Sequence, residues 1–411
     1  MMLPLHGVGG STDLPIPFGY AVVGASWALT ISFAVLALAW KQPRFAGEAT
    51  AAEQRPRRPL LAVLGLALTC WIFGALYLGP EDSRNGGVQA IYVLVWVGLV
   101  PLAIAFGHIW RDLSPWRTIQ AAIGKMTGRS NGFLRYPAAL GYWPAAVGLF
   151  AFVWLELASP DPGSVSAVGL WVAVYAVVTV LGGVVFGRQW FDRADPFDVY
   201  SAIIARLSPF VRDGRWMLHN PLRSLPAVPV HPGLVAVLAV LLGSTAYDSF
   251  SSSQFWQSRA ISDLTGTLTL LGFCVVVGVL FVAAAIATGG LSAAERRRLP
   301  GLMAHSLVPI VAGYMFAHYL TYLLEKGQLA VSALIDPNAD YDITYFLSEH
   351  TSLLAVLKVG FVLAGHVLAV IAAHDKSLDL LPRSHRLTGQ LAMLLLMVGY
   401  TFLGLYLLFS V

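Results

Sequence analysis

AHSLVPIVAGYMFAHYLTYLL, residues 304–324, is followed by KVGFVLAGHVLAVIAAHD, residues 358–375, and both stretches are strongly apolar. Each is close to the ~20 residues that a helix needs to cross a bilayer. The two stretches nevertheless hold four of the ten histidines of the chain, His305, His318, His366 and His374. An ionisable side chain inside a membrane is costly, so these histidines are candidates for a functional site.

The composition of the whole chain agrees with these two stretches. Hydrophobic residues make up 57% of the 411 residues and charged residues only 12%, which excludes a water-soluble globular protein of ordinary make-up. The net charge of +4 comes from basic residues scattered over short loops, so nucleic acid is not expected as a partner. The sequence predicts an all-α integral membrane protein whose surroundings are the lipid bilayer.

Windows of about 20 apolar residues predict ten transmembrane helices. They form one polytopic domain, residues 17–410, preceded by an outer N-terminal segment, residues 1–16. The expected spans are residues 17–40, 59–80, 88–110, 137–158, 165–187, 233–248, 264–288, 301–325, 351–373 and 387–410.

The loops between these spans alternate in charge. Five of them, residues 41–58, 111–136, 188–232, 290–300 and 375–386, hold 22 of the 26 lysines and arginines. Because basic loops stay in the cytoplasm, these five are predicted to be cytoplasmic and both termini to lie outside. No loop is long enough for a soluble catalytic domain, so any chemistry is expected in or on the membrane.

A motif is repeated in the predicted cytoplasmic loops. FGHIWRDLSPW, residues 106–116, and FGRQWFDRADPF, residues 186–197, share Phe-Gly, a tryptophan three residues after the glycine, and a proline followed by an aromatic residue. The repeat suggests duplication of a two-span unit, although two ordinary helix starts would look similar. An amphipathic stretch follows each proline, and the second one extends to residue 211. Both stretches predict interfacial helices on the cytoplasmic face.

Helical phase and depth gather one group of polar residues in the outer half of the membrane. Four of them stand at i, i+4, i+8 and i+11 on one stripe of the expected helix 301–325. The neighbouring spans bring further ionisable groups to about the same depth. The outer segment with His6 and Asp13 could fold over them, although its glycines favour a flexible tail. This group consists of Tyr314, His318, Tyr322 and Glu325 on the stripe, with Lys358, Glu156 and Asp248 from other spans.

A second group is expected near the cytoplasmic side. It contains His305, His366, His374, Asp375 and, at the end of the third span, His108. His366 and His374 are roughly 12 Å apart along one helix, which is too far for both to bind one metal ion. His305 could meet either of them across a neighbouring helix, although single histidines near span ends are commonly structural.

Three classes of function fit these groups. A hydrolase would use His305, His318, His366 and His374 to bind a divalent metal that activates water, with Lys358, Asp248, Glu156, Tyr314 and Tyr322 as catalytic side chains. A redox or metal-handling protein would bind haem or copper, although histidine spacings of 13 and 8 residues are out of phase for a two-haem bundle. A transporter would place Lys358, His318, Glu156 and Asp248 along a path. The sequence does not show the paired Gly/Pro interruptions of broken transport helices.

Several strings resemble one group of bacterial proteins. HGVGGSTDLPIP (6–17), PFDVYSAIIARLSP (196–209), GSTAYDSFS (243–251), HSLVPIVAGYMFAHYLTYLL (305–324) and GHVLAVIAAHD (365–375) are similar to multi-pass membrane proteins labelled fenitrothion hydrolase. The resemblance implies a hydrolase of a lipophilic ester of the organophosphorus type in the bacterial inner membrane. It also leaves room for a second membrane subunit, and it assigns no catalytic residue. Because none of the candidate residues stands in an HExxH, HxH or GxSxG motif, a site would have to be assembled from several helices.

Overall fold

The computed structural model describes residues 13–45, 57–213, 215–338 and 341–409. Within these residues, eight helices are long and apolar enough to cross a membrane, which confirms the expected all-α membrane protein. The eight are α1 (Phe18–Ala39), α2 (Pro59–Leu78), α8 (Val165–Phe186), α12 (Leu234–Ser251), α14 (Asp263–Ile286), the composite helix Leu299–Ile335, α20 (Thr351–Leu380) and Thr388–Phe409, whose main part is α21 (Leu391–Phe409).

The remaining two expected spans are a bent helix and a short one. The bent helix consists of α3 (Gly86–Gln89), the π-helix η4 (Ala90–Val97) and α4 (Leu99–Phe106), and it turns by 42° at the break. The amide of Gly98 bonds the carbonyl of Val93 five residues back, and Pro101 removes a further amide, so the break has a local cause. The sequence does not show paired Gly/Pro interruptions, and this single break was not anticipated from it. The short one is α7 (Trp143–Leu157).

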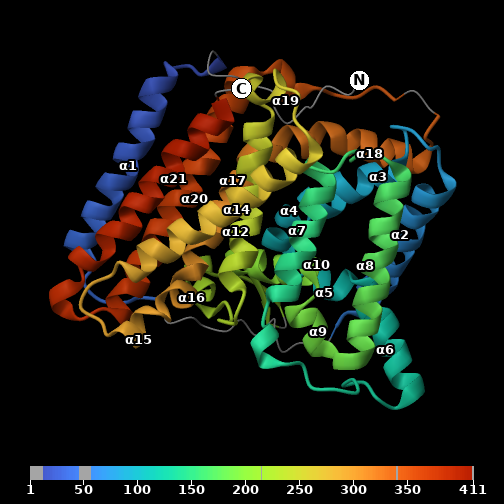
Figure 1. Cartoon of the computed structure of the whole chain (residues 1–411), viewed down its shortest axis with the longest axis horizontal. Helices are drawn as coiled ribbons and strands as arrows, with labels where there is room; N and C mark the ends of the chain where they lie inside the picture. The colour runs from blue at the N-terminus through green and yellow to red at the C-terminus, as the bar shows by residue number, and fades with distance from the viewer. Residues whose placement is uncertain (1–12, 46–56, 214, 339–340, 410–411) are drawn as a thin grey trace.

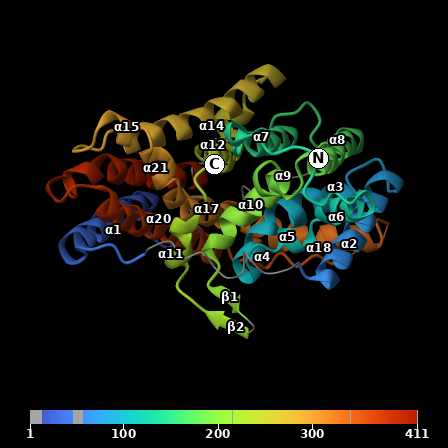
Figure 2. The same cartoon turned by 90° about the horizontal axis from the view of Figure 1, so that it is seen from below.

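Short elements complete the chain. They are α5 (Trp110–Leu113), α6 (Pro115–Thr127), η5 (Ala138–Leu140), α9 (Arg188–Arg193), α10 (Pro196–Ile204), η6 (Ala205–Leu207), β1 (Phe210–Asp213), β2 (Arg215–Leu218), α11 (Pro221–Ser224), η7 (Leu225–Ala227), α13 (Gln254–Gln257), α15 (Ala293–Arg296), α19 (Phe346–Glu349), η10 (Arg383–His385) and η11 (Thr388–Gln390). The antiparallel hairpin β1–β2 projects from the helices when the molecule is seen from below (Figure 2).

The composite helix Leu299–Ile335 departs from α-helical winding at two places. It consists of α16 (Leu299–Met303), the 3₁₀ turn η8 (Ala304–Leu307), α17 (Val308–Thr321), the π-helix η9 (Tyr322–Lys326) and α18 (Gly327–Ile335). The expected span 301–325 covers its first part. Beyond η9 the chain continues as α18, which lies across the upper side of Figure 1 and packs on α3 and η4.

Glycines bring α17 and α20 into close contact. A Cβ atom added to Gly313 would lie 2.5 Å from the carbonyl oxygen of Phe361, and one added to Gly365 would lie 2.5 Å from that of Pro309. Only hydrogen fits at these two positions, so the backbones of the helices approach each other directly. The two apolar stretches that carry the four histidines are therefore neighbours.

The two copies of the repeated motif have the same backbone form. Gly107 has φ 74° and ψ −152°, and Gly187 has φ 64° and ψ −144°, a conformation that glycine adopts readily. Each glycine ends a long helix, and a short helix and then a proline-started helix follow. The helix after each motif packs on the span that precedes the other motif, since α6 contacts α8 and α10 contacts α4.

The two amphipathic helices differ in their surroundings. The first, α6, is buried on one side and exposed on the other, as a helix on a surface would be. The second, α10, was expected on the membrane surface and to run to residue 211, and both expectations were wrong. Eight of its nine residues are buried against α4, α5, α7 and α9. The α-helix ends at Ile204 and continues as the 3₁₀ turn η6 to Leu207, where the helical backbone stops because Ser208 precedes Pro209 and a residue before proline avoids the helical conformation.

The basic loops lie at one end of the molecule, which we call the basic end. In Figure 1, α6, α9 and α15 lie along the lower side, while α3, α18 and α19 lie along the upper side. A guanidinium nitrogen of Arg386 donates to the carbonyl of Lys41 at 3.1 Å, which joins two of these loops. At the opposite end, the rings of Phe18 and Phe409 are 6.0 Å apart, so the start of α1 lies beside the end of α21.

Candidate functional site

A buried aspartate and histidine form the centre of the candidate site. His318 Nε2 lies 3.0 Å from Asp248 Oδ2, and the hydroxyl of Tyr319 donates to the same oxygen at 2.7 Å. Asp248 comes from α12, whereas His318 and Tyr319 come from α17, and all three are at most 3% exposed. The expected proximity of Asp248 and His318 is thus present in the structure, in a setting with little contact with water.

The other ring nitrogen of His318 contacts a serine. His318 Nδ1 lies 3.1 Å from the hydroxyl of Ser249, which in turn is 3.0 Å from the hydroxyl of Tyr314. Ser249 follows Asp248 directly on α12, so one imidazole ring bridges two consecutive side chains of the neighbouring helix. Ser249, His318 and Asp248 therefore form a continuous hydrogen-bonded relay, which we call the Ser–His–Asp relay.

The partners of His318 determine how protons are arranged in this relay. An ionised Asp248 can only accept, so a neutral His318 donates its Nε2 hydrogen to that carboxylate. Nδ1 is then left with its lone pair and accepts the hydroxyl hydrogen of Ser249. Serine, imidazole base and orienting carboxylate stand here in the order that activates a serine nucleophile. In the usual triad Nε2 faces the serine and Nδ1 faces the carboxylate, whereas here Nδ1 faces the serine and Nε2 the carboxylate.

A cavity of about 860 Å³ leads to Asp248 from the end opposite the basic end. Glu156 and Tyr322, two of the predicted catalytic residues, line this cavity together with Asp248. The carboxyl groups of Glu156 and Asp248 are close enough to interact electrostatically. Five acidic residues line the cavity, and no lysine or arginine is among its described lining residues, so we call it the acidic cavity. The five are Glu81, Asp82, Glu156, Asp161 and Asp248.

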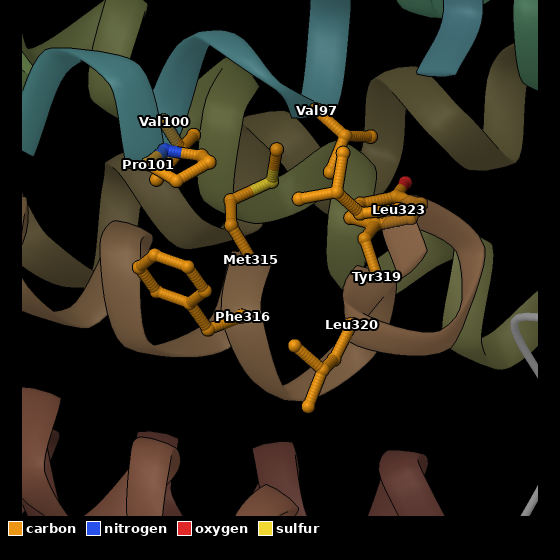
Figure 3. Close-up of a pocket in the computed structure, with 8 residues that line it drawn as sticks. All are labelled: Val97, Val100, Pro101, Met315, Phe316, Tyr319, Leu320 and Leu323. Carbon is orange, nitrogen blue, oxygen red and sulfur yellow. The ribbon is translucent and has the colours of Figure 1, made fainter. Parts of the chain in front are cut away.

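An apolar groove approaches the same site from another side. It lies between α17 and the bent helix, and it is lined by the eight residues labelled in Figure 3: Val97, Val100, Pro101, Met315, Phe316, Tyr319, Leu320 and Leu323. The groove is narrow, with room for about 10 Å³. Tyr319, whose hydroxyl binds Asp248, is the polar member of its lining. One side of the relay thus faces a polar cavity and another faces an apolar groove.

Two predicted members of the outer group have other partners. Lys358 is buried on α20, where its ammonium lies 5.9 Å from the centre of the Phe409 ring and interacts electrostatically with Asp13. Glu325 accepts hydrogen bonds from the backbone and hydroxyl of Ser348 at 2.9 and 2.6 Å. His6, for which the sequence left open a place over the site, lies outside the described residues.

The inner histidines have separate surroundings. His305 Nδ1 lies 3.0 Å from the carbonyl of Leu302, and His366 Nδ1 lies 2.8 Å from that of Val362, so each bonds within its own segment. His374 contacts the side chain of Gln390 at 2.8 Å and a carbonyl at the end of α1 at 3.1 Å.

These contacts bear on the predicted metal site. In the described part of the chain, no three His, Cys, Asp or Glu side chains come together in a way that could hold a metal ion. His108, expected with the inner group, instead lies 2.8 Å from Asp198 at the basic end.

Sequence reasoning missed two members of the site, Ser249 and Tyr319. Both stand next to predicted residues, Ser249 after Asp248 and Tyr319 after His318. The signal was present in the polar run Ser-Thr-Ala-Tyr-Asp-Ser at residues 244–249, because polar residues inside a predicted span require partners. Comparison with protein-family models, with curated proteins and with solved structures finds no match to the chain.

Proposed function

We propose that the protein is a membrane-embedded hydrolase of lipophilic esters that uses Ser249 as its nucleophile. The Ser–His–Asp relay is the observation that carries this proposal, with distances of 3.1 Å from Ser249 to His318 and 3.0 Å from His318 to Asp248. The resemblance described above adds the substrate class, an ester of the organophosphorus type. In this proposal a relay of side chains supplies the nucleophile and the base, the part that was assigned from the sequence to a divalent metal.

Each member of the relay has a defined task. The oxygen of Ser249 attacks the phosphorus or carbonyl carbon of the ester, while its proton moves to His318 Nδ1. Asp248 stabilises the positive charge that develops on the imidazole. The bond to the leaving oxygen then breaks and that oxygen takes the proton from His318. Water next attacks the ester on Ser249 and gives its proton to His318, which returns it to the serine oxygen and releases the acid.

Tyrosines assist at both ends of the relay. The hydroxyl of Tyr314 lies 3.0 Å from that of Ser249 and donates to the carbonyl of Gly404 at 3.4 Å, so it would turn from that carbonyl to donate to negative charge developing near the serine. The hydroxyl of Tyr319, 2.7 Å from Asp248, holds the carboxylate in place. Two of the residues predicted as catalytic, Asp248 and Tyr314, keep that role in the proposal, and His318 becomes the general base.

The surroundings fit a lipophilic substrate and water. The acidic cavity is a route for water and for a polar product, since it lies open at one end and is lined by carboxylates. The groove of Figure 3 offers apolar contacts beside Tyr319. An ester dissolved in the bilayer would have to widen this narrow groove as it enters, and it would then place only its reacting group at the relay.

Charge favours the hydrolase over a transporter for simple ions. The acidic cavity repels anions, whereas a cavity at the basic end carries six arginines and repels cations. An ion of either sign would meet a repulsive region at one end of its path. The bend at Gly98 favours a transporter, but the bent helix also forms one wall of the apolar groove.

We further propose that all ten apolar segments cross the bacterial inner membrane. The charge of the loops then places the basic end in the cytoplasm and both termini outside. With this orientation the acidic cavity opens to the outer side, and the relay lies within the outer half of the membrane.

Replacement of Ser249 tests the proposal. The wild-type chain, purified in a neutral detergent, should hydrolyse p-nitrophenyl butyrate or diethyl p-nitrophenyl phosphate. Ser249→Ala should lower kcat at least about 10³-fold, as loss of a serine nucleophile does in other serine hydrolases.

A neighbouring serine provides the matched control. Ser251→Ala removes a hydroxyl from the same helix, at the lining of the acidic cavity and outside the relay, and it should keep most of the activity. Equal turnover by the wild type and Ser249→Ala, or no turnover of either ester by the wild type, would contradict the proposal.

A further inference from the structure

The basic end contains a large cavity that the proposed reaction does not use. Its volume is about 980 Å³, within the range of sites for small molecules. Three loops far apart in the sequence supply its polar lining. Six arginines and one carboxylate line it: Arg57, Arg111, Arg117, Arg188, Arg193 and Arg206, with Asp192.

The wall of this cavity is built around one buried ion pair. Arg117 on α6 contacts Asp198 on α10 through Nε at 2.5 Å and Nη2 at 2.9 Å, a two-pronged arrangement. His108 lies 2.8 Å from the same carboxylate. Burial alone would raise the pKa of Asp198, but the charges of Arg117 and His108 hold it well below its usual value. Asp198 therefore stays ionised, fixes both basic groups, and joins the two repeated units.

A second arginine of the lining, Arg57, is held by hydrogen bonds to neutral groups. Arg57 donates to the carbonyls of Arg111, Asp112 and Ser114 at 2.8 to 3.2 Å and to the hydroxyl of Thr118 at 3.0 Å, all of them neutral acceptors. These bonds hold the guanidinium in a fixed place without cancelling its charge. Asp192, the acidic residue of the lining, already lies 2.6 Å from Arg117.

The positive potential affects neighbouring groups. Burial and the charge of Arg117 lower the pKa of the Arg57 guanidinium. Burial and the charge of Arg193 likewise lower the pKa of His231, whose ring packs 5.3 Å from that of Tyr142 at the edge of the cavity. Both groups thus lie in a region that disfavours further positive charge. A bound anion would relieve this repulsion.

We propose that this cavity binds an anion of the phosphate class, either a phosphorylated small molecule from the cytoplasm or the headgroup of an anionic lipid. Several guanidinium groups around one cavity suit a multiply charged oxyanion, because their planar forks donate paired hydrogen bonds to phosphate oxygens. A ligand with a single carboxylate would neutralise only a small part of this positive charge. The site is separate from the Ser–His–Asp relay, so it does not depend on the proposed hydrolase activity.

Thermal unfolding of the purified full-length chain tests this binding site. Inorganic pyrophosphate, added at constant ionic strength against chloride, should raise Tm in a saturable way, because a ligand of the folded state stabilises it. A second arm adds short-chain phosphatidic acid to the detergent micelles. A shift with pyrophosphate indicates a free phosphorylated ligand, and a shift with phosphatidic acid alone indicates a lipid headgroup.

Charge variants show whether the cavity is responsible. Arg188→Gln and Arg193→Gln should each weaken the apparent Kd about 10-fold, which is the usual scale for one charge-assisted bond. Arg188 is exposed, so its replacement should not disturb folding. Arg297→Gln makes the same change of charge in another basic loop outside the cavity and should leave the Kd unchanged. The proposal is overturned if neither probe shifts Tm, or if all three variants respond like the wild type.

Discussion

Replacing Gly365 with alanine should push α17 away from α20. The added Cβ would lie 2.5 Å from the carbonyl oxygen of Pro309 and 3.3 Å from the Cα of Gly313. Ordinary contacts of this kind are about 1 Å longer than the first distance, and that carbonyl belongs to a helix backbone that cannot rotate aside. The helices must therefore separate or bend near the point where they touch.

The loss of folding stability follows from the rigidity of this contact. Overpacking of a tight interior costs about 1 to 3 kcal/mol, and a clash with backbone belongs in the upper part of that range. The effect should also reach the candidate site, since His318 lies on the same helix as Gly313, five residues further along. A misplacement of about 1 Å at a catalytic group lowers turnover about 10²-fold.

Tryptophan fluorescence during heating in detergent measures the first effect, and ester hydrolysis measures the second. Gly360→Ala is the matched control, because it adds the same methyl group to the same helix where nothing lies within 4 Å. Gly365→Ala should lower Tm by several degrees relative to Gly360→Ala and reduce turnover. Equal Tm and equal turnover of the two variants would refute the close contact of the helices.

Two further predictions concern the basic end. Asp198→Asn should destabilise the fold by about 3 to 5 kcal/mol, because it leaves buried Arg117 without its main counter-charge. Asp192→Asn, at the exposed end of the same network, should lower the stability by about 1 kcal/mol or less. Similar Tm values for the two variants would contradict the central role of Asp198. Burial and Arg193 lower the pKa of His231 below 6.5 in the folded protein, so stability without an anion should fall as the pH falls below 6.5. Protonated His231 adds positive charge to the cavity, so the affinity for sulfate should rise as the pH falls. The charge of sulfate itself is constant over this range. An affinity that stays constant from pH 7 to pH 5 would argue against a role for His231.

Much of the fold follows from patterns that act over short distances in the sequence. Apolar length alone located the expected spans, because each helix satisfies its own backbone hydrogen bonds in the membrane. The repeated Phe-Gly motif predicted two equivalent turns, and Gly107 and Gly187 indeed share one glycine-type conformation. The stripe of Tyr314 and His318 followed from helical phase in the same way.

Features that depend on contacts between distant segments could not be predicted in this way. The amphipathic pattern of α10 is the same whether a helix lies on a lipid surface or against other helices, and only the packing of α4 and α7 shows that it is buried. The arginines of three loops looked scattered along the chain, yet they line one cavity. Depth placed Asp248 near His318, but the partnership with Ser249 depends on the rotation of α12, which the sequence pattern leaves open.

Covalent labelling of Ser249 tests the proposed hydrolase most directly. A lipophilic fluorophosphonate loses fluoride and forms a phosphorus–oxygen bond with a serine that is activated by a histidine. Mass spectrometry of the labelled, digested protein should find the adduct on Ser249, and His318→Ala should abolish it while the fold, followed by Tm, is retained. An intact protein that takes up no label, or one labelled equally at Ser251 and Ser252, would contradict the role of Ser249 as the nucleophile.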